Sequence, residues 1–90
     1  MKTYPKIQAV APLPDKCLRV TFVNKTIQIY DCKPLLKDDE FSSLEDDVLF
    51  NAVKTDQGGY GISWNEDIDL SESELWINGS LTEKNGVNIQ

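Results

Sequence analysis

The chain has 90 residues, 40% of them hydrophobic and 27% charged, which is the ordinary composition of one small soluble domain. Its formal net charge is −6, and this acidic balance argues against general nucleic-acid binding, which needs clustered lysine and arginine. The charge is also divided lengthwise, because residues 1–33 carry a net charge of +4 and residues 34–90 carry −10. The two halves can pair internally or give the protein two electrically different faces.

No apolar run approaches the length of a membrane span, and the N-terminus enters a strand-like pattern without the core of a signal peptide. We therefore predict a cytoplasmic protein. In that compartment Cys17 and Cys32 are expected as reduced thiols, with a disulfide between them as the alternative. Because the chain has no histidine and no Cys-x-x-Cys motif, we predict neither a metal nor a cofactor.

A first strand is predicted over residues 6–13, with Pro12 near its end. A hairpin follows, because residues 16–23 and 26–32 both alternate between apolar and polar side chains. Asn24-Lys25 lies between these two runs and is predicted to form a two-residue turn.

The two-residue turn decides which side chains of the hairpin share a face. It places Leu18, Val20 and Phe22 on the first strand together with Ile27 and Ile29 on the second. Both strands then separate their apolar and polar residues cleanly, so this face is expected to be the core.

The same register places Cys17 directly opposite Cys32 and turns Asp31 toward the core. A buried carboxylate needs hydrogen bonds or a cation. We therefore expect Asp31 to accept from backbone N–H groups between Lys33 and Leu36, so that its replacement by alanine lowers the melting temperature by several degrees.

Short helical turns are predicted over residues 34–49, where acidic and polar residues surround leucines at helical spacing. A second hairpin is predicted over residues 50–64, around a glycine-containing loop. Ser71 and Glu74 fit a capping box and predict a helix over residues 72–77.

These elements predict an α+β fold with two layers, in which short helices near 34–49 and 72–77 accompany an antiparallel sheet of about five strands. Gly79 is expected as the C-cap of the last helix. Residues 5–79 are predicted to form a single domain, and residues 80–90 a polar, loosely ordered tail.

Six carboxylates form two clusters that are candidates for partner binding: Asp38, Asp39, Glu40, Glu45, Asp46 and Asp47. A solvated face is their ordinary explanation, and a docking surface for a basic partner is the functional one. Tyr60, Trp64 and Trp76 are ordinarily core residues, but they would join such a surface where they are exposed. Four basic residues of the first half are candidates for a basic face: Lys6, Lys16, Arg19 and Lys25.

Catalytic and metal-binding motifs are missing from the sequence. There is no histidine, no phosphate-binding glycine loop and no nucleophile–base pair, so we predict that the protein is not an enzyme. Asn65, Asp67 and Asp69 alternate as in a calcium loop, but Leu70 and Trp76 stand where that loop needs Gly and Glu. We therefore assign Asp69 a structural role, as we do Asp31 and the helix-capping Ser71.

The order of apolar and special residues between about positions 5 and 77 resembles a bacterial family, the domain of unknown function numbered 2442. The residues that carry the resemblance are Ile7, Val10, Pro12, Leu13, Leu18, Val20, Phe22, Ile29, Asp31, Pro34, Leu35, Leu36, Phe41, Leu44, Phe50, Val53, Trp64, Asp69, Leu70 and Leu75. The resemblance implies a two-layer α+β fold, named after the N-terminal domain of a Nitrosomonas europaea protein, and brings no established catalytic residues.

The resemblance also implies a genetic context, because members of the family are often encoded beside another small protein in a toxin–antitoxin-like arrangement. Some members carry an added helix-turn-helix, for which the eleven residues after Gly79 are too few. The first functional hypothesis is therefore a protein-interaction module, the acidic member of such a pair, that binds a small basic protein. A nucleic-acid binder using the basic hairpin and a small-ligand-binding domain near Trp64 are the alternatives, and a homodimer formed through an edge strand is compatible with all three.

Overall fold

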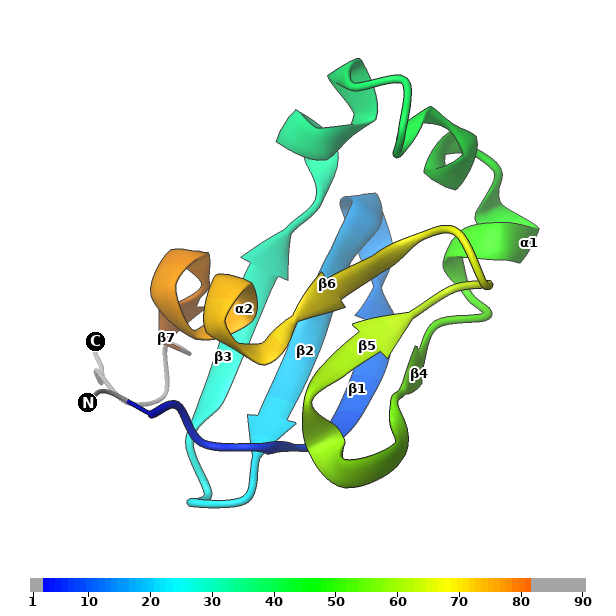
Figure 1. Ribbon diagram of the computed structural model, residues 1–90. Helices are drawn as coiled ribbons and strands as arrows, with labels where there is room; N and C mark the ends of the chain where they lie inside the picture. Colours follow the sequence, from blue (N-terminus) through cyan, green and yellow to red (C-terminus); the bar gives the residue numbers. More distant parts are fainter. Residues whose placement is uncertain (1–2, 82–90) are drawn as a thin grey trace, which may run out of the picture.

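Two antiparallel sheets form the frame of the protein in the computed structural model, which describes residues 3–81 (Figure 1). The larger sheet has the strand order β1-β2-β3-β7, and the smaller has the order β4-β5-β6. The strands of the larger sheet are β1 (Ile7–Leu13), β2 (Cys17–Phe22), β3 (Ile27–Asp31) and β7 (Ser80–Leu81). Those of the smaller sheet are β4 (Lys54–Thr55), β5 (Gly61–Ser63) and β6 (Asp69–Ser71).

The helices are short, as expected. Between residues 3 and 81, two are α-helices, α1 (Asp47–Phe50) and α2 (Glu72–Asn78), and four are 3₁₀ turns: η1 (Pro14–Lys16), η2 (Lys33–Lys37), η3 (Ser42–Glu45) and η4 (Gln57–Gly59). Ser71 caps α2, because its hydroxyl accepts from the backbone N–H of Glu74 at 3.2 Å. The backbone N–H of Gly79 donates to the Leu75 carbonyl at 3.0 Å and closes the helix. The predicted α+β class is confirmed, with the strands divided between two sheets.

The core lies between the larger sheet and the elements that Figure 1 shows in front of it, α2 and the smaller sheet. Leu18, Val20 and Phe22 of β2 are fully buried there, and the Trp76 ring meets Phe22 edge-on, with 5.1 Å between ring centroids. The other core residues are Ile7, Tyr30, Cys32, Phe41, Leu44, Phe50, Ile62, Trp64, Ile68 and Leu75.

The register of β2 and β3 differs from the predicted one by a single residue. Cys17 pairs with Asp31 and Leu18 with Tyr30, because the connecting loop has three residues. Lys25 ends this loop with φ of +77°, its N–H donates to the Phe22 carbonyl at 2.9 Å, and the Phe22 N–H donates to the Thr26 carbonyl at 2.9 Å. A left-handed third residue is typical of three-residue hairpin loops.

One residue of shift exchanges the two faces of β3. The predicted core positions of Ile27 and Ile29 were wrong: both are half-buried on the outer face, and Gln28 and Tyr30 point into the core. With its amide oriented to satisfy both carbonyls, Gln28 donates to Leu75 O at 2.9 Å and to Trp76 O at 3.2 Å. The Tyr30 hydroxyl donates to Glu74 Oε2 at 2.7 Å. These two polar side chains therefore join β3 to α2, which is why burial is tolerated.

The shift also separates the two cysteines, so the predicted opposition of Cys17 and Cys32 was wrong. Both are free thiols. Cys17 is half-buried beside Asp31, whereas Cys32 is fully buried, and that burial raises its thiol pKa to about 12.

The second hairpin is shorter than the predicted span of residues 50–64. Asp46 accepts from the Val48 N–H at 3.0 Å and caps α1, so Phe50 ends a helical turn instead of beginning a strand. Strand β6, which the sequence did not predict, leads directly into α2. Ser80–Leu81 of the predicted tail forms β7, and residues 82–90 lie outside the described residues.

The loop geometry makes Lys25→Gly a stabilising substitution. A non-glycine residue in the left-handed region carries a penalty of about 1–2 kcal/mol, part of which glycine returns through its larger unfolded-state entropy. We expect a net gain of about 0.5–1 kcal/mol and a melting temperature higher by about 3–6 °C in thermal unfolding. Lys25→Ala removes the same charge without relieving the backbone, so an equal rise in that variant would contradict the loop geometry.

Candidate functional site

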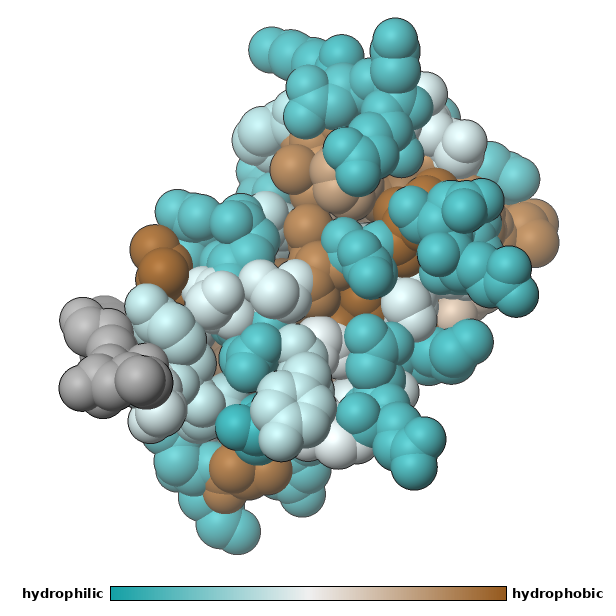
Figure 2. All heavy atoms as spheres, viewed as in Figure 1, coloured by the Kyte–Doolittle hydropathy of each residue, from teal (hydrophilic) through white to brown (hydrophobic). Residues whose placement is uncertain are grey.

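The six clustered carboxylates lie in one stretch, which we call the acidic segment (residues 38–47), and every one of them is exposed. Phe41 and Leu44 anchor the segment, because both side chains are buried in the core. The segment connects η2 to α1 across one end of the larger sheet (Figure 1). Hydrophilic residues gather at that end in Figure 2, with hydrophobic residues visible beneath them. The acidic segment is therefore a fixed surface feature.

An open cleft of about 710 Å³ lies between the turn that joins β1 to β2 and the elements η2, η3 and α1. Its apolar lining is Pro12, Leu13, Pro14, Leu36 and Phe50. Its polar lining is Asp15, Lys16, Lys33, Glu45, Asp47 and Asn51. The cleft thus offers an apolar floor whose rim includes the end of the acidic segment.

The turn that forms one wall of the cleft is strained. Asp15 and Lys16 are consecutive non-glycine residues in the left-handed region, with φ of 62° and 58°. Such residues cost about 1–3 kcal/mol each and persist only where surrounding contacts hold them. Here the Cys32 N–H donates to the Lys16 carbonyl at 2.9 Å, and Lys33 Nζ donates to the Asp15 carbonyl at 3.0 Å.

Lys16 also joins the basic half of the chain to the acidic half. Its ammonium donates to the Glu45 carbonyl at 3.0 Å and forms an ion pair with Asp47, and it lies 5.2 Å from the centre of the Phe50 ring. The Lys16 side chain is 15% exposed and that of Asp47 is 86% exposed. Internal pairing of the two halves therefore occurs at this cleft.

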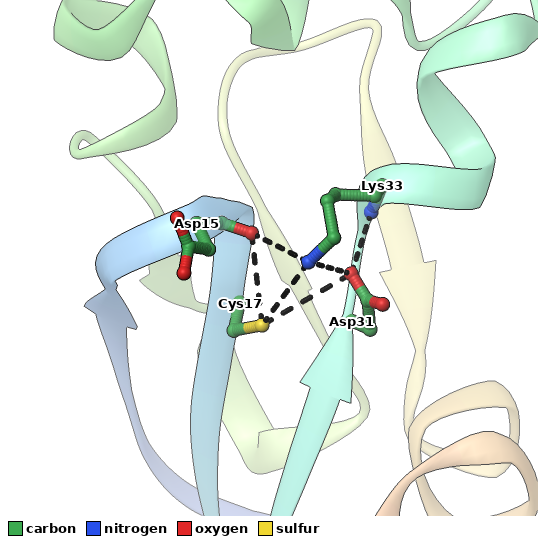
Figure 3. A network of polar contacts seen from close by, with 4 residues as sticks. All are labelled: Asp15, Cys17, Asp31 and Lys33. Carbon is green, nitrogen blue, oxygen red and sulfur yellow. Dashed lines mark hydrogen bonds and ion pairs between the residues drawn. The ribbon is translucent and has the colours of Figure 1, made fainter.

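Lys33 organises a second polar network behind the turn (Figure 3). Its ammonium lies 3.0 Å from Asp31 Oδ1 and 3.9 Å from Cys17 Sγ, in addition to its bond to Asp15. Asp31 Oδ1 also accepts from the Lys33 backbone N–H at 2.9 Å. The predicted backbone bond of Asp31 is confirmed, but its predicted burial was wrong, because the register shift leaves its side chain 49% exposed.

The four candidate basic residues do not form one face. Lys16 and Lys25 lie at opposite ends of β2, and Arg19 is exposed between them on the outer face of the larger sheet. Lys6 lies 4.5 Å above the exposed ring of Tyr60. The four basic residues are therefore dispersed over the molecule, and Lys16 is already paired with Asp47.

The candidate aromatic residues are also separated. Trp64 is buried, and its indole N–H donates to the Phe50 carbonyl at 3.2 Å, so its proposed place on a surface was wrong. Trp76 is half-buried against Phe22, and Tyr60 is 60% exposed. The exposed apolar residue beside the acidic segment is instead Val48, at 80% exposure.

The side chains of the loop before β6 bind backbone groups. The Asn65 carboxamide accepts from the backbone N–H groups of Asp67 at 2.8 Å and Ile68 at 3.0 Å, and Asp69 is exposed at the start of β6. Within residues 3–81, no group of three or more His, Cys, Asp or Glu side chains could hold a metal ion.

The cleft and its strained turn were not predicted from the sequence. Pro14-Asp15 signals a turn, but nothing local indicates left-handed conformations at Asp15 and Lys16. The contact that completes the site joins Lys16 to Asp47, 31 residues away. The exposure of Val48 was not predicted from the sequence either.

Comparison with known proteins gives one match. The family model described as a protein of unknown function, DUF2442, matches residues 7–79. The chain belongs to the DUF2442 family. No curated protein and no solved structure matches it significantly. None of the helices between residues 3 and 81 has the length and apolarity needed to cross a membrane.

Lys16→Met tests the contact between the two halves of this DUF2442 protein. Methionine keeps the apolar stem against Phe50 and removes the ammonium, so we expect a loss of about 1 kcal/mol in unfolding free energy. Asp47→Asn, at an exposed position, should cost less than about 0.5 kcal/mol, since exposed ion pairs contribute little. Chemical denaturation of both variants measures the two losses in unfolding free energy. Equal losses would contradict the dominant role of the lysine.

The Asp31 contacts predict a pH dependence. The hydrogen bond from the Lys33 backbone N–H and the Lys33 ammonium lower the pKa of Asp31. A lowered folded pKa stabilises the fold above the unfolded pKa of about 4, and this stabilisation is lost as pH falls through the folded pKa. The difference in melting temperature between wild type and Asp31→Asn should therefore be present at neutral pH and shrink below about pH 4. A difference that does not change with pH would contradict this assignment.

Proposed function

We propose that this DUF2442 protein is a non-enzymatic protein-interaction module whose acidic segment and adjoining cleft bind a small basic protein. The observation that carries the proposal is the display of six exposed carboxylates on one anchored stretch. Within residues 3–81, only Asp47 among the six forms an ion pair. Asp46 caps α1, and the other four are available to a cationic partner, which they would attract over a distance and orient on approach.

The cleft supplies apolar contacts that the acidic segment alone does not offer. Leu13, Leu36 and Phe50 line its floor, and Val48 adds an exposed apolar side chain next to Asp47. A segment with basic side chains beside one or two apolar ones matches this combination. Interfaces gain most of their binding energy from buried apolar anchors and their specificity from the surrounding charges.

Family membership supports a neighbouring gene product as the partner, because the resemblance described above implies a paired, toxin–antitoxin-like gene arrangement. In such a pair this chain, with its net charge of −6, would be the acidic cytoplasmic member. The nucleic-acid alternative has less support, because its four candidate residues are dispersed and Lys16 is already paired.

Charge removal tests the proposal. The product of the neighbouring gene is co-expressed with this chain, the complex is purified, and its dissociation constant is measured by calorimetry at low and moderate salt. In the test variant, Asp38→Asn, Asp39→Asn and Glu40→Gln remove three charges from the acidic segment. We expect at least about tenfold weaker binding and a smaller dependence on salt, since each such charge contributes up to about 1 kcal/mol.

A matched control removes three exposed carboxylates from the loop before β6 and the start of that strand, by Glu66→Gln, Asp67→Asn and Asp69→Asn. It changes the net charge by the same amount, so it should bind the partner nearly as tightly as wild type does. If both variants bind the partner equally weakly, the loss of affinity comes from the change in net charge and not from the acidic segment. No complex at micromolar concentration would overturn the choice of partner.

A further inference from the structure

The outer face of the larger sheet carries two isoleucines at positions where an exposed sheet face ordinarily has polar residues. The strand pairing puts Ala11 of β1, Arg19 and Thr21 of β2, and Ile27 and Ile29 of β3 on this face. Each is half-buried or exposed, whereas Figure 1 shows α2 and the smaller sheet on the opposite face. No element between residues 3 and 81 covers the outer face.

The inversion is sharpest on β3. An antiparallel strand with one solvated face alternates with its apolar residues inward and its polar residues outward. β3 does the reverse, since Gln28 is 6% exposed in the core while Ile27 and Ile29 face out. Leaving two isoleucines only half-buried forgoes part of the stabilisation that their full burial would give, and covering the outer face recovers it.

We propose that a second copy of this chain covers the outer face, so that the protein is a homodimer whose larger sheets pack face to face. The electrostatics select this occupant. A second copy also carries a net charge of −6, and its approach to the acidic segment is repelled. The outer face carries Arg19 and Asp31 instead, which are opposite in sign.

Twofold symmetry makes these two charges complementary. In an isologous interface residue i of one copy meets residue j of its partner, and j meets i. Arg19 pairs with Ile29 in the sheet and so lies two residues along from Asp31, on the same face. Asp31 binds Lys33 through Oδ1. Two Arg19–Asp31 contacts can therefore form across the axis through Asp31 Oδ2, one on each side. Among described residues Arg19 has no acidic partner within its own chain.

The size of the face sets the strength of the dimer. A six-residue strand is about 20 Å long, and three neighbouring strands span about 15 Å. The face therefore covers about 300 Å² per copy, or about 600 Å² for the pair, which is smaller than a standard specific interface, so the dimer is expected to be weak and transient, with a dissociation constant of about 100 µM. The acidic segment lies at the end of the sheet, so this interface differs from the surface proposed above for a basic partner, and either proposal can fail without the other.

Sedimentation velocity of the full chain measures the monomer–dimer equilibrium. Concentrations between about 1 and 500 µM cover the dissociation constants expected of so small an interface. We expect wild type to shift from monomer to dimer in this range. Ile27→Thr with Ile29→Thr keeps β-branched residues on the strand but removes apolar contact, and should weaken the dimer at least tenfold. Val48→Thr, at an exposed apolar position elsewhere, is the control and should leave it unchanged. A wild type that stays monomeric throughout would overturn the proposal.

Mixing two charge-reversed variants separates this interface from any other mode of dimerisation. Arg19→Glu alone makes both contacts across the axis carboxylate against carboxylate, and Asp31→Lys alone makes both cation against cation, so each variant should be monomeric. In the mixture one contact joins two introduced charges of opposite sign and the other joins the two native ones, so a heterodimer should form. Circular dichroism of each variant first confirms that it is folded. Homodimers that persist in both variants, as an edge-strand dimer would, also overturn the proposal.

Discussion

The three-residue loop between β2 and β3 fixes most of what distinguishes this molecule. Because Lys25 adopts a left-handed conformation, β3 pairs one residue out of step with a two-residue turn, and its two faces are exchanged. Gln28 and Tyr30 then enter the core, where they hold α2 through the carbonyls of Leu75 and Trp76 and through the Glu74 carboxylate. The same choice places Ile27, Ile29 and Asp31 outside. One backbone angle therefore determines both how α2 is attached and what the outer face presents.

The attachment of α2 also explains why Gly79 follows the helix. A β-carbon at that position would lie 2.5 Å from the Gln28 side chain and 2.6 Å from the Leu75 carbonyl. Its φ of −81° needs no glycine, so the requirement is one of space and not of conformation. Glycine thus permits the close approach by which β7 continues from α2 and pairs with β3.

The sequence was sufficient for the first three strands and α2, but insufficient for the register of β2 with β3 and for the strands of the smaller sheet. Alternation located β1, β2 and β3, the Ser71 capping box located α2, and leucine spacing indicated the short helices. Asn24-Lys25 was misread because a lysine gives no signal of left-handed backbone, and the resulting two-residue turn separated apolar from polar residues more cleanly than the real loop does. Trp64 and Phe50 are buried, as their apolar side chains suggest. The helical turn that contains Phe50 could not be predicted from them, because it depends on the Asp46 cap. The cleft could not be predicted, since Lys16 meets Asp47 only after the chain has folded.

The lengthwise division of charge has a structural counterpart. At Lys16 the basic half contacts the acidic half, and this contact helps to hold two strained residues in the turn beside the cleft. Between residues 3 and 81, four of the six carboxylates in the acidic segment take part in neither an ion pair nor a helix cap, and Arg19 on the outer face of the larger sheet has no acidic partner. The two surfaces therefore suit different occupants, a cation-rich protein for the first and a like-charged copy for the second. A dimer of the proposed kind carries two acidic segments, so a basic partner that itself repeats or dimerises would meet both at once, and linked binding of this kind strengthens an association without any new contact.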